Sequence, residues 1–423
     1  MSQNQPSDPD LNTRAPLDGV RVVDFTWIVA GPTCTRLLGD LGAEVIRVEN
    51  EQTLDSIRFG RPHPNGFNPP DSGAMFNWLD RNKRSITVNA RHPDGLDLIK
   101  RLIRISDVVV ENYSSRILEN WGLSFEEQRA ENPQIIYVSL SGFGHSGPQR
   151  DYSTWGPTAQ ALSGLTAMSG LPEAPEPAGW GYSYLDHMAG FTAAAAITAA
   201  LRHRRDAGQG QWIDLSQVET GMALTGPATL DYTVNGRRYR ETGNPPGNHS
   251  VWPQSAPHNT YPTAGHDNWI MITCTSDAEW ESFCHASDHP HWRTDSRFAT
   301  LPARLRHQDE LDEQIGSWTA GQDGRALMKR LQSADVPAGV VQNGVDLVVR
   351  DPQMKSRYWT VTREHPVIGE HLTDGLQIRF SRTPAHRDLP GPPLGEANQY
   401  VFSDLLGLSD ERIAELQVNG AMG

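Results

Sequence analysis

The sequence predicts an α/β fold with an open, mostly parallel, Rossmann-like sheet. Short apolar runs alternate with helical patterns from residue 20 to residue 140, which is the order in which parallel sheets are built. Several runs, above all the valines at 108–110, are apolar at consecutive positions, as expected of strands that helices cover on both faces. The chain shows no long internal repeat, which excludes solenoids and propellers.

The first strand is predicted at 20–25, and a helix at 34–41 follows the Gly31-Pro32 pair. A strand at 44–48 completes a β-α-β unit, and the same alternation then continues. It predicts strands at 85–88, 107–110, 135–140 and 212–215, and helices at 92–105, near 117, from 125 after Ser124, at 189–205 and at 216–224. Ser216 followed by Glu219 is a capping box for the last of these helices.

The second half of the chain has a different pattern, which predicts a smaller second domain. A chain of 423 residues is too long for one ordinary core. Residues 1–15 are polar, and we expect a disordered leader there. From residue 232 onward the sequence predicts a linker and loop at 232–260, a hairpin at 261–273, helices over 276–333, strands at 338–345 and 375–380, and a helix after Ser409.

Composition excludes several classes of protein. The formal net charge is −14, from 37 Lys and Arg against 51 Asp and Glu, so we expect no nucleic-acid partner and no attachment to an anionic membrane. No apolar run is long enough to cross a membrane, and no secretory signal is visible. The three cysteines have no paired spacing, which favours a cytoplasmic location and predicts no metal site.

The motifs of common enzyme classes are absent or lie in the wrong context. Gly142–Gly147 matches G-x-G-x-x-G, but Pro148 and the polar residues after it do not open an apolar helix. A nicotinamide dehydrogenase is therefore only a formal alternative. The chain has no Walker A loop, no G-x-S-x-G elbow and no H-E-x-x-H motif.

Two local features can carry chemistry. Asp186 lies at the start of an Ala-rich helical pattern. It can simply cap that helix, or it can be an ionised nucleophile near the positive end of the helix dipole. Arg81, Lys83, Arg84 and Arg91 form a basic group around the third strand, which can hold phosphate or form a solvated turn.

Ordered motifs from residue 16 onward resemble the class III CoA-transferases, the family of formyl-CoA:oxalate and carnitine CoA-transferases. The motifs are Pro16–Thr26, Ala30–Pro32, Leu41–Glu49, Asn82–Ile86, Asp107–Tyr113, Ser141–Gly144, Gly208–Ser216 and Leu405–Ser409. The resemblance implies an interlocked homodimer with a Rossmann-like large domain built from both chain ends. It places the first part of this CoA-binding domain at 16–225, a small domain with linkers at 226–335, and the return to the large domain at 336–423.

The resemblance also implies a mechanism. Asp186 matches the family's nucleophile, whose carboxylate attacks an acyl-CoA donor to give a mixed anhydride and then an aspartyl-CoA thioester. A free carboxylic acid is the acceptor. No permanently bound cofactor is implied, because coenzyme A enters as the acyl-CoA co-substrate. We expect a homodimer, with a hetero-oligomer containing a related subunit as the alternative.

Matching positions imply the CoA contacts. They are Val29, Ala30, Val88, Asn89, Arg91, Asn112 and Tyr113. Two family arginines are Asn50 and Asn120 here, and Arg47, Arg91 and Arg116 are the candidates to supply the lost phosphate contacts. The expected substrate pocket is formed by Trp155, Tyr182, Tyr184, Gly243 and Asn244.

Two alternatives share the fold. The α-methylacyl-CoA racemases use a histidine as a second base, and its position holds Trp155 here, so proton abstraction and return lack one partner. A non-catalytic CoA-binding homologue is the other alternative, although such a protein has no reason to retain Asp186.

Overall fold

The computed structural model describes residues 14–64, 66–172, 174, 176–240, 245–383 and 388–423. The chain divides into two compact units. The first unit holds residues up to Thr166 together with Trp180–Thr229 and Lys355–Gly423, and the second holds Ala167–Gly179 and Leu230–Met354. Among the described residues, no helix is both long enough and apolar enough to span a membrane. The domain assignments made from the sequence stay predictions.

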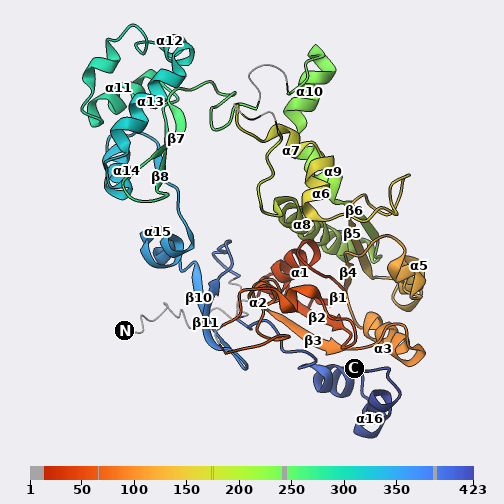
Figure 1. The fold of residues 1–423 in the computed structure, drawn as a ribbon. Helices are drawn as coiled ribbons and strands as arrows, with labels where there is room; N and C mark the ends of the chain where they lie inside the picture. The colour runs from red at the N-terminus through yellow and green to blue at the C-terminus, as the bar shows by residue number, and fades with distance from the viewer. Residues whose placement is uncertain (1–13, 65, 173, 175, 241–244, 384–387) are drawn as a thin grey trace. The chain divides into compact units, whose positions relative to one another are not determined.

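The first unit is built on a six-stranded sheet with the order β3-β2-β1-β4-β5-β6 (Figure 1). Its strands are β1 (Arg21–Asp24), β2 (Glu44–Glu49), β3 (Lys83–Thr87), β4 (Val108–Glu111), β5 (Ile136–Ser141) and β6 (Trp212–Ser216). Every neighbouring pair is parallel, which confirms the predicted sheet. The chain reverses its direction across the sheet between β1 and β4, and a crevice forms at such a switch point.

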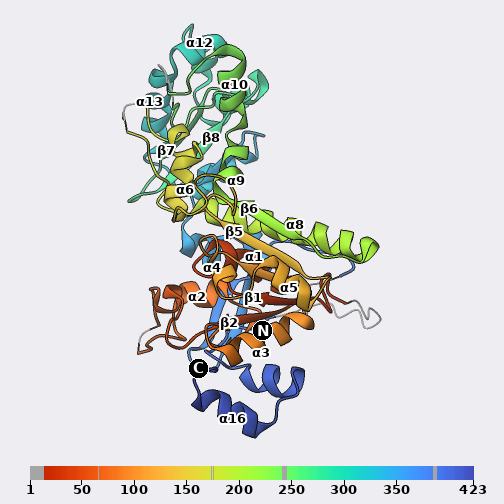
Figure 2. The same ribbon diagram turned by 90° about the vertical axis from the view of Figure 1, so that its right-hand side faces the viewer.

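Both faces of this sheet are covered, because alternate strand residues point to opposite sides. Val22 packs with helices α1 (Ala30–Asp40) and α8 (Tyr184–Ala207), whereas Val23 packs with α3 (Pro93–Arg104) and α16 (Asp410–Val418). Figures 1 and 2 show these helix pairs on the two sides of the sheet. Each fully buried valine or isoleucine contributes about 1.5–3 kcal/mol to folding.

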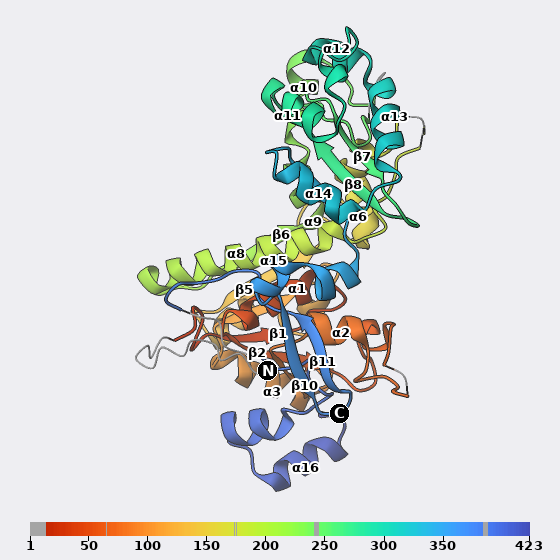
Figure 3. The same cartoon turned by 90° about the vertical axis from the view of Figure 1, so that its left-hand side faces the viewer.

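Shorter elements complete the first unit. They are η1 (Ser56–Phe59), α2 (Ala74–Leu79), α4 (Ile117–Asn120), α5 (Phe125–Glu131), α6 (Gly156–Leu162), α9 (Gln217–Leu224), η4 (Tyr400–Leu405) and the antiparallel pair β10 (Thr360–His365) and β11 (Gly369–Asp374), seen side by side in Figure 3. Ser124 caps α5, as predicted, and it does so through a full capping box that was not predicted. Ser216 caps α9 by accepting a hydrogen bond from the backbone N–H of Glu219.

The second unit has its own antiparallel sheet, β7-β8-β9, and its own core. Its elements are β7 (His258–Pro262), β8 (Trp269–Thr273), α11 (Asp277–Ala286), η2 (Pro290–Arg293), α12 (Leu301–Arg306), α13 (Gln308–Thr319), α14 (Gly324–Gln332), β9 (Ala338–Val340) and η3 (Asp346–Arg350). The predicted hairpin and helical region are confirmed. Helices α7 (Leu165–Met168), α10 (Gly226–Asn235) and α15 (Pro352–Ser356) span the unit boundaries along the chain.

Several predicted boundaries are wrong. The strand expected at 338–345 ends at Val340, and the helix expected at 34–41 begins at Ala30. No strand forms at 375–380, because the β10-β11 ladder closes where Gly375 donates to the Trp359 carbonyl, and the chain beyond has no partner strand. Residues expected in the loop at 232–260 extend α10 to Asn235. Helix α8 begins at Tyr184 rather than 189, because Leu185 and Ala189 lie one turn apart on its buried face.

Candidate functional site

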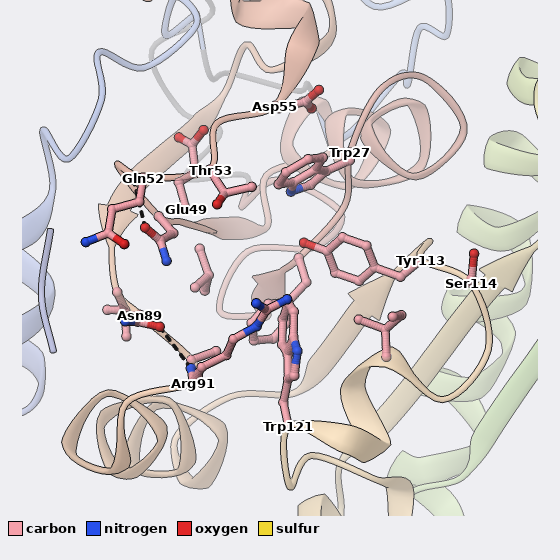
Figure 4. A pocket seen from close by; sticks show the side chains of 16 residues that line it. Trp27, Glu49, Gln52, Thr53, Asp55, Asn89, Arg91, Tyr113, Ser114 and Trp121 are labelled. Atoms are coloured by element: carbon pink, nitrogen blue, oxygen red, sulfur yellow. Dashed lines mark hydrogen bonds between the residues drawn. The ribbon is translucent and has the colours of Figure 1, made fainter. Parts of the chain in front are cut away.

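A cavity of about 410 Å³ lies where β1 and β4 diverge, at the carboxyl ends of the first four strands (Figure 4). It is lined by Phe25, Trp27, Val48, Glu49, Asn50, Gln52, Thr53, Asp55, Val88, Asn89, Ala90, Arg91, Tyr113, Ser114, Ile117 and Trp121. The position follows from the strand order, because open α/β sheets bind ligands at this switch point. The cavity is large enough for a substantial part of a nucleotide-sized ligand.

Aromatic rings form one wall of the cavity. Tyr113 makes edge contacts with Trp27 at 5.8 Å and with Trp121 at 5.5 Å between ring centroids. The Arg91 guanidinium lies 5.8 Å from the Trp121 centroid, and Figure 4 shows it directed toward that ring. The wall can stack against a planar ring such as adenine while Arg91 attracts negative charge.

Four predicted CoA-binding residues line this cavity: Val88, Asn89, Arg91 and Tyr113. The other three lie beside it. Asn112 holds the Trp27 backbone by accepting from its N–H at 2.7 Å and donating to its carbonyl at 2.9 Å. Val29 and Ala30 are buried at the start of α1, in the chain segment that follows Trp27.

Two of the four basic residues near the third strand behave differently from either prediction. Arg81 and Lys83 are buried and hold ion pairs, Arg81 with Asp40 and Asp374, Lys83 with Asp80 and Asp24. They form neither a phosphate site nor a solvated turn, because their charges are already matched inside the sheet.

The three arginines proposed to replace the lost family arginines lie in different environments. Arg91 lines the cavity together with Asn50. Arg47 is fully buried against Asp55 and Asp80, and Arg116 is half exposed beside Asp151 at 3.5 Å. Asn120 ends α4 outside the cavity lining. Of the three candidates, only Arg91 is placed to meet a ligand in this cavity.

Asp186 lies in the first turn of α8 and is 8% exposed. It is not the N-cap, because the helix begins at Tyr184 and Ser183 occupies that position. The Gln217 side-chain amide donates a hydrogen bond to Asp186 Oδ1. The other carboxylate oxygen lies so close to Gly156 that a Cβ on that residue would overlap it. Only glycine leaves space for the carboxylate in this position.

Burial raises the pKa of the Asp186 carboxyl above its ordinary value, and hydrogen bonding from Gln217 and Ser183 opposes that rise. The first turn of a 24-residue helix also favours a negative charge. No arginine or lysine forms an ion pair with Asp186 in the described part of the chain. The result is a carboxylate that is held in place and incompletely neutralised, which suits a nucleophile.

Helix packing connects Asp186 with the chain segment that borders the cavity. Gly190, one turn after Asp186, packs directly on the Ala30 carbonyl and on Thr33 of α1. Thr33 Oγ1 also lies 3.0 Å from Nδ1 of His187. The turn at Val29 and Ala30 therefore lies between the aromatic wall and the helix that carries the carboxylate.

The expected substrate-pocket residues lie around this helix start. Trp155 immediately precedes Gly156 and is 67% exposed. Tyr182 stacks on His187 at 5.1 Å, and Tyr184 contacts Trp180 at 4.9 Å. Gly243 and Asn244 lie outside the described residues.

Sequence reasoning missed two residues, far from Asp186 in the sequence, that are in direct contact with it. Gln217 follows the predicted cap Ser216, and Gly156 follows Trp155, but no spacing rule joins either residue to position 186. The Gly142–Gly147 motif follows β5, yet the next helix, α6, starts only at Gly156. In the described residues, no cluster of three or more His, Cys, Asp or Glu side chains is placed to hold a metal ion.

Comparisons with known proteins agree with this geometry. The model of CoA-transferase family III matches residues 17–398. Succinyl-CoA–D-citramalate CoA-transferase from Chloroflexus aurantiacus is 37% identical over 404 residues, covering 95% of this chain and 97% of the relative. Succinate–glutarate CoA-transferase from Agrobacterium fabrum is 31% identical, covering 93% and 96% of the two chains.

A solved structure has a similar fold over nearly the whole chain. A CAIB/BAIF family protein from Brucella suis superimposes with a TM-score of 0.82 at 30% identity, covering 93% of this chain and 100% of that one. The predicted resemblance is confirmed over nearly the whole length. The chain is a CoA-transferase enzyme and belongs to CoA-transferase family III.

Proposed function

We propose that this enzyme transfers CoA from an acyl-CoA to a free carboxylic acid through covalent intermediates on Asp186. The observation that carries the proposal is the state of this carboxylate: it is buried, fixed by Gln217 and free of any ion pair among the described residues. Its helix packs on the start of α1, which follows the cavity residue Trp27 in the chain. A structural aspartate in the same place gains nothing from lacking a counter-ion.

The reaction proceeds in balanced steps. The Asp186 carboxylate attacks the donor's thioester carbonyl, and the carbon–sulfur bond breaks to give a mixed anhydride and CoA thiolate. The thiolate attacks the Asp186 carbonyl of the anhydride, forms an aspartyl-CoA thioester and releases the donor acid. The acceptor carboxylate attacks that thioester to form a second anhydride and thiolate. The thiolate then takes the acceptor's acyl group and restores the Asp186 carboxylate.

Each residue has a role in these steps. The aromatic wall and Arg91 would hold the nucleotide part of CoA, and the turn at Val29 and Ala30 would lie beside the thioester. The Gln217 amide would stabilise the oxygen that carries charge when the Asp186 carbonyl becomes tetrahedral. The acids of the named relatives support a short dicarboxylic acid as substrate, with succinyl-CoA as the donor to test first.

We also propose that the active form is an interlocked homodimer in the cytoplasm. Trp155 and Tyr182 leave 67% and 54% of their surfaces exposed around Asp186, and a second copy would cover such aromatic surface. The three cysteines of the chain are unpaired, which supports a reducing compartment. Sedimentation of the native protein would test for a homodimer against a monomer or a mixed oligomer.

The proposal is tested by trapping the thioester. The protein is mixed with succinyl-CoA, reduced with borohydride or treated with hydroxylamine, digested and weighed. We expect the Asp186 side chain to become an alcohol or a hydroxamate in the wild type and to stay unmodified in Asp186→Asn. Exchange of the α-proton of a 2-methylacyl-CoA with solvent, without any trapped adduct, would contradict the proposal and favour a racemase.

A further inference from the structure

Arg36, on helix α1, is a buried cation that forms no ion pair with any residue the structure describes. Only 5% of its surface is exposed, and its Nε and Nη1 atoms are shielded from solvent without a hydrogen-bond partner. The Trp78 ring lies beside the guanidinium, with its centroid 5.1 Å from the guanidinium carbon. Leaving a buried charge in this state is costly to folding.

The other deeply buried arginines of the described chain each have a carboxylate partner. Arg47 contacts Asp80 at 2.7 Å, Arg58 contacts Glu49 at 2.6 Å, and Arg81 contacts Asp40 at 2.8 Å. Arg304 contacts Asp277 at 3.1 Å, and Arg363 lies 3.5 Å from Asp388. The fold therefore pairs buried guanidinium groups as a rule, and Arg36 is the exception.

The carboxylates in the neighbourhood of Arg36 are already used by other cations. Asp40, Asp80 and Asp374 attract Arg36 over a longer range, but each forms its short ion pair with Arg81 or Lys83. Burial and the charge on Arg81 lower the pKa of Arg36. The guanidinium therefore has two shielded N–H groups that bind no anion among the described residues.

The guanidinium of Arg36 lies near the residues that surround Asp186. His187, the next residue along α8, has its pKa lowered to about 4 by burial and by the charge on Arg36. The Tyr182 phenol, which stacks on His187, is influenced by Arg36 and by Asp186. The rings of His187 and Tyr182 thus lie close to Asp186 and also within the electrostatic influence of Arg36.

We propose that Arg36 binds the non-reacting carboxylate of a dicarboxylic substrate and thereby sets the enzyme's preference for such acids. This inference rests on the proposed function, because it places the reacting carboxyl carbon at Asp186. A guanidinium binds a carboxylate through two parallel N–H bonds. The Trp78 ring and the stacked His187 and Tyr182 rings offer an apolar lining for the methylene groups between the two carboxyl carbons.

The test compares two donors that differ only at the far end of the acyl chain. Succinyl-CoA carries a carboxylate where butyryl-CoA carries a methyl group. We expect Arg36→Met to lower kcat/KM for succinyl-CoA by about 10- to 100-fold, the range for a lost hydrogen bond to a charged group, and to leave the slower butyryl-CoA reaction unchanged. Arg36→Lys should retain part of the preference. Arg330→Met, at another arginine beside a tryptophan, is the matched control.

Other outcomes would overturn the inference. An equal loss with both donors would assign Arg36 to the structure, and weaker binding of free CoA would assign its anion to a CoA phosphate. An unchanged preference would remove Arg36 from recognition altogether. Absence of the trapped Asp186 adduct in the wild type would refute the proposed mechanism, whereas a normal adduct with an unaltered donor preference in Arg36→Met would refute only the role of Arg36. If Arg36→Met does not fold, the donor preference of Arg36→Lys decides.

Discussion

Two groups of buried charges in the first unit differ in whether their members form ion pairs. At the ends of β2 and β3, arginines and carboxylates are fully paired, and Glu49 shows the effect. Burial alone would raise its pKa, but Arg47 and Arg58 lower it to about 2. Around α8, burial raises the pKa of Asp186 and no cation compensates for it. Paired charges keep the fold together, and the unpaired ones are available for substrate.

The largest expected effect is the loss of turnover in Asp186→Asn, at least about 10³-fold, because the amide cannot form the anhydride. The same change removes a buried, unpaired charge, so the melting temperature should stay the same or rise. Steady-state kinetics and thermal unfolding check the two parts. A variant that melts well below the wild type would show that Asp186 belongs with the stabilising charges instead.

Arg47→Met should lower the stability of the fold, whereas Asp186→Asn should lower the activity. It leaves Asp55 and Asp80 buried beside an apolar side chain, so we expect a loss of about 3–5 kcal/mol in the free energy of unfolding, measured by urea denaturation. Arg297→Met, at an exposed ion pair in the second unit, should leave the free energy of unfolding nearly unchanged. A stable Arg47→Met variant with weakened CoA binding would instead assign Arg47 to the ligand.

Gln217→Leu should have a smaller effect on stability than Arg47→Met and the most specific effect on activity. The amide stabilises the ionised form of Asp186, so its removal raises the pKa of that carboxyl. Activity requires the ionised form, and the acidic limb of the kcat/KM profile should therefore move to higher pH. Gln128→Leu removes another buried glutamine, which donates to the Leu123 carbonyl at 2.7 Å, and should not move the limb. An equal shift in both variants would exclude a specific effect on Asp186.

Much of the fold was predictable because it depends on local periodicity. The apolar runs at 20–25, 44–48 and 107–110 are short, consecutive and separated by helical patterns, and the six-stranded sheet follows from them. The strands at 360–365 and 369–374 were not predicted, because their residues are largely polar and pairing with each other is what defines them.

The candidate site was predictable only in part. Asp186 could be found because it opens a strongly helical segment and matches a family motif. Gln217 lies 31 residues further on and reaches Asp186 only through tertiary packing. The sequence around Arg36 predicts only a helix that covers the sheet. That Arg36 forms no ion pair among the described residues follows only from the contacts of the neighbouring carboxylates in the structure.

The most direct test of the central claim follows oxygen atoms through turnover. In the proposed mechanism, each acceptor carboxylate leaves one of its oxygens on Asp186 when the second anhydride is resolved. We therefore expect ¹⁸O from labelled succinate to enter the Asp186 peptide during turnover with succinyl-CoA, as read by peptide mass, and to be absent from Asp186→Asn. Sustained CoA transfer by the wild type without ¹⁸O in that peptide would contradict a covalent role for Asp186.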